Sequence, residues 1–314
     1  MGCDAKVFAA LALGLAVVAG AGIGTYVALR KSPSEKKECE ERKKFLEEQL
    51  AKAASPDAFL KNLYSEKNPK VLFIGEIHPQ DLGKSYYPKL VDHLKNEGVD
   101  CIQYEGHPDM QKAVEGYLAG KLPYRVVEGI SYKYFNEPPT ESFLQATKKA
   151  NIKLRYVDKA KEEVVATIQA KNLNSKSPEL NEITLQFMEK RNREMAQSIA
   201  ESHLRGECKK SAVIVGLAHL YEVTALKGKY PVSVQDYVAQ NSLSTAQIGV
   251  ISSKGKNGNP LKPIDCDWAL TTSSPVGFKV PKGTQHALYP HLPLEGVESR
   301  EAPWSILDGM IVVQ

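Results

Sequence analysis

The chain has 314 residues, of which 42% are hydrophobic and 25% are charged, and its formal net charge at pH 7 is +4. These values are typical of a globular protein that buries a core of its own. Its basic residues are interleaved with acidic ones and form no stripe with aromatic side chains between them. The composition therefore argues against nucleic acid as a partner.

The first 31 residues contain an uncharged apolar stretch, Val7–Leu29, that is long enough to cross a bilayer as a helix. A cleaved signal peptide is the alternative, with a small-residue cleavage site at Ala19-Gly20-Ala21. Because the hydrophobic character continues as far as Leu29, we favour an uncleaved anchor. We therefore expect a signal anchor or transmembrane helix over residues 1–31, with the membrane as a partner. A charged helical stalk is expected over residues 32–55.

The charges around this stretch give opposing indications of which side the main domain faces. Lysines and arginines between positions 30 and 44 follow the apolar stretch, whereas only Lys6 precedes it. The positive-inside rule places the main domain in the cytoplasm, but a signal peptide would export it. The facing side stays open on these residues alone.

The five cysteines are widely spaced and include no C-x-x-C pair: Cys3, Cys39, Cys101, Cys208 and Cys266. That spacing excludes a ribbon-type zinc site and argues against a disulfide framework. We expect free, half-buried thiols, with one or two bridges only if the domain is exported.

From residue 70 onward, short apolar stretches alternate with segments of helical periodicity. Strands are expected at Val71–Ile74, Cys101–Tyr104, Ile152–Val157, Ala212–Val215, Ile248–Ile251 and Met310–Val313, and the longest helix at Pro178–Leu204. This alternation predicts an α/β domain over residues 56–255, with a largely parallel central sheet flanked by helices. Residues 123–139 are expected to be irregular, and residues 256–314, rich in proline and glycine, to form a C-terminal extension packed on the core.

Acidic residues and histidines follow four of the expected strands. They are Glu76 and His78 after the first, Glu105 and His107 after the second, Asp158 after the third and His219 after the fourth. Because the carboxyl ends of parallel strands meet at one edge of a sheet, we expect these side chains to share one cleft. Asp158 can equally cap the helix that follows it.

Imidazole and carboxylate groups together suit Zn, Mn, Fe or Co, with a coordination position left for water. We therefore predict His78, His219 and Glu76 as metal ligands. Glu76 can also serve as a general base, with Glu105 as a further catalytic acid. Gly75 precedes Glu76 where the strand is expected to break sharply, and Gly216 occupies the equivalent place before His219; glycine permits the backbone angles of such a break.

The long helix supplies a candidate anion-binding residue, Arg191, which lies close to its apolar side at Met188 and Met195. A guanidinium there can hold a carboxylate, either of a substrate or of a haem propionate. If haem is the cofactor, we expect His107, Tyr132 or Tyr134 to bind the iron and Arg191 to bind a propionate.

These motifs resemble those of the superfamily that includes Tiki proteases, TraB/GumN-like proteins and ChaN-like haem-binding uptake proteins. The likeness is carried by Phe73–Pro79, Glu105, Arg191–Ala196 and Val213–Leu220, the last with the closing Gly-x-x-His. The resemblance implies an α/β fold whose two Gly-x-x-His histidines and first glutamate face a common cleft. The Gly-Glu-x-His form of the first motif resembles the ChaN-like branch, and the resemblance slightly favours an extracytoplasmic domain.

Three functions are compatible with this pattern. The first is a metal-dependent hydrolase, a peptidase or an esterase, acting on a small molecule or peptide. The second is a haem-binding protein in iron uptake that has no catalytic activity. The third is an interaction scaffold in which the charged rim is only structural.

Overall fold

A computed structural model describes residues 33–76, 82–133, 139–171, 178–220, 224–225, 232–252, 272, 274–280, 298–299 and 307–313. The apolar stretch Val7–Leu29 lies outside these ranges. Within them, no helix has both the length and the apolar character needed to cross a membrane.

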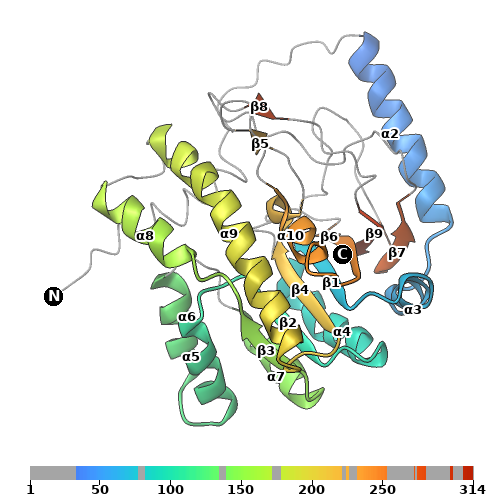
Figure 1. Ribbon diagram of the computed structural model, residues 1–314. Helices are drawn as coiled ribbons and strands as arrows, with labels where there is room; N and C mark the ends of the chain where they lie inside the picture. The colour runs from blue at the N-terminus through green and yellow to red at the C-terminus, as the bar shows by residue number, and fades with distance from the viewer. Residues whose placement is uncertain are drawn as a thin grey trace.

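The described part of the chain is built on a seven-stranded sheet in the order β3-β2-β4-β1-β6-β9-β7 (Figure 1). Its strands are β1 (Val71–Glu76), β2 (Cys101–Tyr104), β3 (Lys153–Tyr156), β4 (Ser211–Gly216), β6 (Thr245–Ser252), β7 (Val276–Lys279) and β9 (Gly309–Val313). All neighbouring pairs are parallel except β7 and β9. The prediction of an α/β fold with a largely parallel sheet is confirmed. Two short strands, β5 (Thr224–Ala225) and β8 (Glu298–Ser299), pair separately.

Helices cover both faces of the sheet. They are α2 (Pro33–Ala51), α3 (Pro56–Lys67), α4 (Leu82–Asn96), α5 (Asp109–Leu118), α6 (Tyr124–Lys133), α7 (Glu141–Lys149), α8 (Lys161–Ala170), α9 (Pro178–Leu204) and α10 (Val234–Ala239), with a 3₁₀ turn, η1 (Leu217–His219). The segment expected to be irregular, 123–139, instead contains α6. Its apolar residue Val127 is buried, so packing against neighbouring helices stabilises a helix that the aromatic-rich sequence conceals.

The pleat of β1 divides the core into two apolar layers. Leu72 and Ile74 point to one face, where they pack with α3, α4 and α7. Val71 and Phe73 point to the other face, where α9 and α10 lie. Successive strand side chains alternate between faces, so one uniformly apolar strand supplies both layers. The α9 face is the one that carries the candidate site.

Both edges of the sheet are covered by neighbouring residues. At the β3 edge, the Gln111 side chain on α5 donates a hydrogen bond of 2.8 Å from Nε2 to the backbone oxygen of Leu154. At the β7 edge, the backbones of Ala54 and Gly277 exchange two hydrogen bonds of 2.9 Å.

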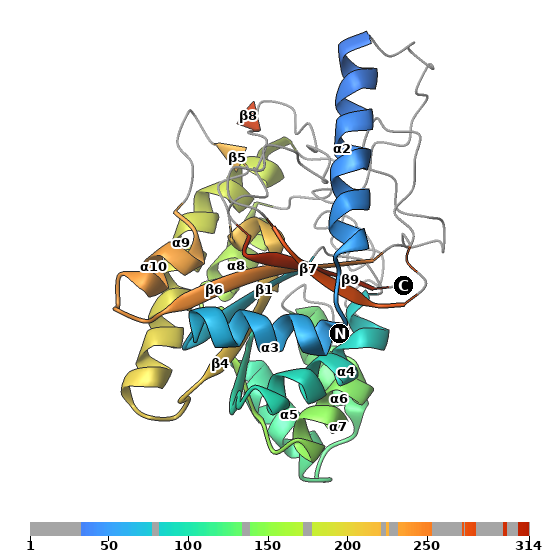
Figure 2. The same cartoon turned by 90° about the vertical axis from the view of Figure 1, so that its right-hand side faces the viewer.

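The N-terminal helix α2 and the C-terminal strands lie on the same side of the molecule (Figure 2). Leu46 of α2 is buried with Phe278 of β7 and Met310 of β9 in a third apolar cluster. Part of the proline-rich C-terminal stretch therefore completes the main sheet. It brings the first described helix and the last described strand into contact.

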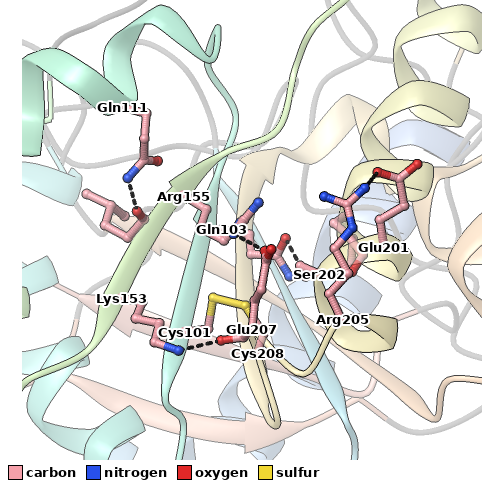
Figure 3. A network of polar contacts seen from close by, with 12 residues as sticks. Cys101, Gln103, Gln111, Lys153, Arg155, Glu201, Ser202, Arg205, Glu207 and Cys208 are labelled. Atoms are coloured by element: carbon pink, nitrogen blue, oxygen red, sulfur yellow. Dashed lines mark hydrogen bonds and ion pairs between the residues drawn. A yellow bond between two sulfur atoms is a disulfide. The ribbon is translucent and has the colours of Figure 1, made fainter.

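At the amino ends of the strands, Cys101 of β2 and Cys208 form a disulfide across a sequence separation of 107 residues (Figure 3). Both cysteines are buried. The expectation of a free thiol is therefore wrong for these two residues. Their pairing was hidden from the sequence because strand order, and not spacing, brings β2 beside β4.

Gly75 is required for a reason other than the one expected. β1 continues through Gly75 to Glu76 without a break, and Gly75 is not among the described glycines with positive φ. A Cβ atom at this position would lie 2.2 Å from Leu217 Cδ1 in η1. The glycine thus allows η1 to approach the strand closely, and the predicted unusual backbone angle is wrong.

Candidate functional site

Four side chains from separate elements meet at the carboxyl ends of the strands on the α9 face. Glu105 follows β2, Asp158 follows β3, Arg191 comes from α9 and His219 ends η1. All four are buried, with exposed fractions between 0% and 7%. Charged residues are seldom buried to this extent unless they are paired. The structure brings these four predicted residues together into one cluster.

Arg191 is the centre of this cluster. Its NH2 atom donates to Glu105 Oε1 at 2.6 Å and to Asp158 Oδ2 at 2.6 Å, and its Nε donates to the same Asp158 oxygen at 3.0 Å. Burial acts to lower the pKa of the Arg191 guanidinium, but Asp158 and Glu105 outweigh it and raise that pKa above its usual value. The carboxylates that Arg191 binds belong to the protein itself. The predicted contact with an external acid would have to compete with them.

Glu105 is held from two further directions. The backbone N–H of Gly216 donates to its Oε2 at 2.7 Å, and the amine of Lys161 lies 3.8 Å from its Oε1. Because Gly216 ends β4, this bond ties the carboxyl end of one strand to the residue that follows its neighbour β2. The Glu105 carboxylate is therefore fixed in position before any ligand arrives.

The two carboxylate oxygens of Asp158 differ in their hydrogen bonding. Oδ2 accepts both bonds from Arg191, whereas Oδ1 is buried and has no hydrogen-bond partner in the described part of the chain. A buried acceptor without a donor carries a desolvation cost, which a bound water or ligand donor would relieve.

His219 is oriented through its second ring nitrogen. Asn192, next to Arg191 on α9, donates from Nδ2 to the Val232 backbone oxygen at 2.8 Å, which turns its Oδ1 toward His219. Asn192 Oδ1 lies 2.5 Å from His219 Nδ1. An amide oxygen only accepts, so Nδ1 carries the proton and Nε2 of the neutral ring keeps its lone pair. That Nε2 lies 3.4 Å from Glu105 Oε1.

Burial favours the neutral form of both basic residues beside Glu105. It lowers the pKa of His219; Glu105 acts to raise this pKa, and Arg191 lowers it further. Burial likewise lowers the pKa of Lys161, again with a further decrease from Arg191 and an opposing effect of Glu105 and Asp158. An imidazole with a lowered pKa is deprotonated at neutral pH and available to accept a proton.

Two residues of the site, Asn192 and Lys161, are not predicted from the sequence. Asn192 belongs to the Arg191–Ala196 motif, so its position beside Arg191 was visible, but its role depends on η1 reaching α9. Lys161 is the first residue of α8 and has an exposed fraction of only 7%. A lysine at a helix start is usually solvated, and no sequence signal marks this one as buried.

The residues predicted to bind haem do not all join the cluster. His107 is buried, but its Nδ1 accepts a hydrogen bond of 3.2 Å from the Asp109 backbone, and its Nε2 lies 3.6 Å from Glu162 Oε2. Tyr132 is 50% exposed on α6. Tyr134 lies outside the described residues. Haem ligation through His107 Nε2 would have to displace Glu162 from this contact, and haem binding stays a prediction.

The predicted metal ligands are only partly described. Glu76 is the last residue of β1 and is half-buried, while His78 lies outside the described ranges. Within the described ranges, no three His, Cys, Asp or Glu residues form a group that could hold a metal ion. Of the predicted ligands, His219 has the required geometry, because its Nδ1 is hydrogen-bonded and its Nε2 keeps a lone pair.

The chain is similar in fold to solved structures, but it matches no known family. No family model matches the chain, and neither does any curated protein. Among solved structures, a protein from Bacillus cereus matches with a TM-score of 0.52 and 13% identity, covering 88% of this chain and 97% of the other. An erythromycin esterase mutant in its open conformation matches with a TM-score of 0.51 and 10% identity, covering 81% and 93%. The fold is similar to that of an erythromycin esterase.

The likeness to this esterase fold is compatible with the superfamily that the sequence motifs suggest, and it does not single out the ChaN-like branch. A more distant match is RRSP, a MARTX toxin effector domain from Vibrio vulnificus, with a TM-score of 0.43 and 18% identity. This chain spans 38% of the length of that domain. At these identities the likeness concerns the fold alone, and any activity has to be argued from the site.

Proposed function

We propose that the chain is a hydrolase of esters or amides in which His219 is the general base and Glu105 its charged partner. The observation that carries the proposal is the contact between Asn192 and His219, which puts the proton on Nδ1 and leaves Nε2 unprotonated at 3.4 Å from the buried Glu105 carboxylate. An imidazole oriented in this way is suited to remove a proton from water. The likeness to an esterase fold is weaker support, since one fold hosts many activities.

The proposed reaction uses groups that the chain itself supplies. His219 Nε2 takes a proton from a water molecule while the water oxygen bonds to the substrate carbonyl carbon, whose π electrons move to the carbonyl oxygen. Glu105 then stabilises the imidazolium. When the tetrahedral intermediate collapses, the bond to the leaving group breaks, and His219 returns its proton to the departing alcohol or amine.

Arg191 acts as a positioning residue in this scheme. It joins Glu105 to Asp158 and is itself buried, so the carboxylate keeps both its charge and its place next to His219. Preorganised charges of this kind stabilise the developing imidazolium without rearrangement during the reaction.

The test is ester hydrolysis by the purified full-length chain, with 4-nitrophenyl acetate as the probe. We expect His219→Ala and Glu105→Gln to lower kcat/KM, the first by about 10²- to 10⁴-fold. The control is His203→Gln, which replaces a half-buried histidine at the amino end of the sheet. Wild-type turnover in His219→Ala would eliminate the proposed general base.

A metal-binding site is the second candidate, because a histidine whose Nδ1 is hydrogen-bonded and whose Nε2 is unprotonated is also the usual arrangement of a metal ligand. His219 would then be joined by Glu76 and His78. The ion would polarise the substrate carbonyl or its attacking water. Metal analysis and a visible spectrum of the purified protein distinguish this candidate, and haem, from the metal-free base. Near-stoichiometric metal that is lost in His78→Ala would favour it.

We also propose that the domain matures on the extracytoplasmic side of a membrane, attached through residues 1–31. The buried Cys101–Cys208 disulfide supports this, since such bonds persist in oxidising compartments. The test is thiol labelling of denatured protein taken directly from cells under acid quench. If Cys101 and Cys208 react without prior reduction, the proposed location is wrong.

A further inference from the structure

The helical hairpin formed by α5 and α6 carries a groove that the reaction proposed above does not use. The groove has a volume of about 330 Å³. Its apolar lining comes from Ala113 on α5, Val126 and Ile130 on α6, and Leu122 in the connecting turn. Leu122 is 38% exposed, and among the leucines that the structure describes Leu204 is more exposed. The volume lies at the lower end of the range for small-molecule pockets.

The charged residues of the groove are gathered toward one end of it. Lys133 ends α6, Asp109 begins α5, and Lys112 follows one turn later. Lys133 Nζ lies 3.9 Å from Asp109 Oδ2. Because the two helices run in opposite directions, Leu122 and Val126 lie at the other end, roughly 10 Å away along α6 at 1.5 Å per residue. One end is cationic, with two lysines and one aspartate, and the other is apolar.

The cationic end adjoins the candidate site. The Asp109 backbone N–H donates to His107 Nδ1 at 3.2 Å. This contact holds His107 against the first residue of α5, at the cationic end of the groove. His107 is itself only two residues after Glu105. The groove therefore leads away from the rim where the proposed general base lies.

We propose that this groove binds the unbranched acyl chain of an ester substrate, with the chain along Val126 and Ile130 and the ester group leaving the groove past Lys112 and Lys133 toward His219. The proposal rests on the proposed hydrolase function and names its substrate class. The apolar walls match a hydrocarbon chain, and the lysines complement a carbonyl or carboxylate oxygen. A chain lying in the groove would cover Leu122, which otherwise stays exposed to water.

The first experiment measures kcat/KM for 4-nitrophenyl esters from acetate to dodecanoate. The full-length chain is expected to prefer dodecanoate over acetate by about tenfold or more, since each buried methylene contributes. Val126→Gln and Ile130→Gln should reduce that ratio, whereas Arg125→Gln, on the exposed side of the same helix, should leave it unchanged. An equal ratio in all four proteins would overturn the proposal.

The second experiment needs no hydrolysis and separates this proposal from the proposed function. The probe is 11-(dansylamino)undecanoic acid, whose fluorescence rises on entering an apolar site, with dansylamide as the chainless control. Saturable binding that Ile130→Gln weakens by about tenfold and His219→Ala leaves intact supports the groove even if no ester is cleaved. Absence of binding, or binding that is equal in Ile130→Gln, overturns it. Thermal unfolding of each variant verifies that the hairpin is folded.

Discussion

The two ends of strands β2 and β4 are held together by different chemistry. At the amino end, Cys101 is joined to Cys208 (Figure 3). Gln103 of β2 also donates to Ser211 of β4 at 3.3 Å. At the carboxyl end, Glu105 accepts from Gly216 and from Arg191. The first end is fixed by a covalent bond, a neutral buried contact and the partly exposed Asp100 carboxylate, which accepts from the Lys209 and Lys210 backbones. The second end is fixed by buried charges. The end available for chemistry is therefore also the end whose stability depends on the balance of buried charges.

The largest effect is expected from removing the charge at the centre of the carboxyl end. Arg191→Met leaves Glu105 and Asp158 buried without their cation, which costs about 3–5 kcal/mol of unfolding free energy. Urea unfolding measures the loss. The matched control is Arg193→Met, two residues along the same helix and exposed, which should change stability by less than about 0.5 kcal/mol. Equal losses in the two variants would mean that the cluster contributes nothing.

The next largest effect is expected at the amino end. Cys101→Ser combined with Cys208→Ser removes a cross-link across 107 residues and is expected to lower the unfolding free energy by about 2–5 kcal/mol. Urea unfolding of the double variant, and of the wild type with and without reductant, measures it. If the reductant destabilises the double variant as much as the wild type, the loss does not come from this disulfide. Activity per folded molecule should survive, because the charges at the other end are untouched.

The pH dependence of stability should distinguish the two ends. Burial lowers the folded-state pKa of His219 at the carboxyl end and of His203 at the amino end. A depressed histidine pKa contributes stability that is present above the unfolded pKa of about 6.5 and is lost as the pH falls toward the folded pKa. The loss reaches at most about 1.4 kcal/mol per pH unit for each histidine.

Unfolding free energies measured between pH 7 and pH 5 test this expectation. His219→Gln should flatten the acid decline more than His203→Gln, because His219 is the more deeply buried. The reverse order would mean that the amino end contains the stronger acid-sensitive group.

The smallest effect is expected from the neutral polar contacts. Ser211 accepts from Gln103 and lies 2.9 Å from His203 Nε2, so Ser211→Ala should cost about 1–2 kcal/mol. Ser198→Ala is the control, because within the described ranges that hydroxyl bonds to the Glu194 carbonyl of its own helix. Calorimetric melting curves compare the pair. A larger loss in Ser198→Ala would contradict the idea that contacts between elements hold the amino end.

The fold and most of the Arg191 cluster could be predicted from the sequence, because both depend on local patterns. The bounds predicted for Cys101–Tyr104 and Pro178–Leu204 agree with β2 and α9, and the residues after parallel strands meet at one rim by geometry. The cluster residues that could be predicted in this way are Glu105, Asp158, Arg191 and His219. The pairing of Arg191 with Glu105 and Asp158 could not be predicted, because it depends on how α9 crosses the sheet.

The features that sequence reasoning missed depend on contacts between distant segments. Cys101 and Cys208 carry no spacing signal, since their proximity follows from strand order alone. Lys161 is buried only because α8 begins beside the Arg191 cluster. The sequence indicates Gly75 correctly as a required glycine but not the reason for it, because the close approach of Leu217 is a tertiary contact.

The two covered edges of the sheet affect how copies of this chain behave when they are crowded. An uncovered outer strand is a template on which a second molecule can add its own strand, the first step toward aggregation. The Gln111 side chain already donates a hydrogen bond to the Leu154 carbonyl, and the Ala54 backbone already forms hydrogen bonds with the Gly277 backbone. A neighbouring molecule would have to displace the glutamine before it could extend the sheet at β3, or the backbone bridge before it could extend the sheet at β7. The fold therefore protects itself against self-association through one glutamine and one short backbone bridge.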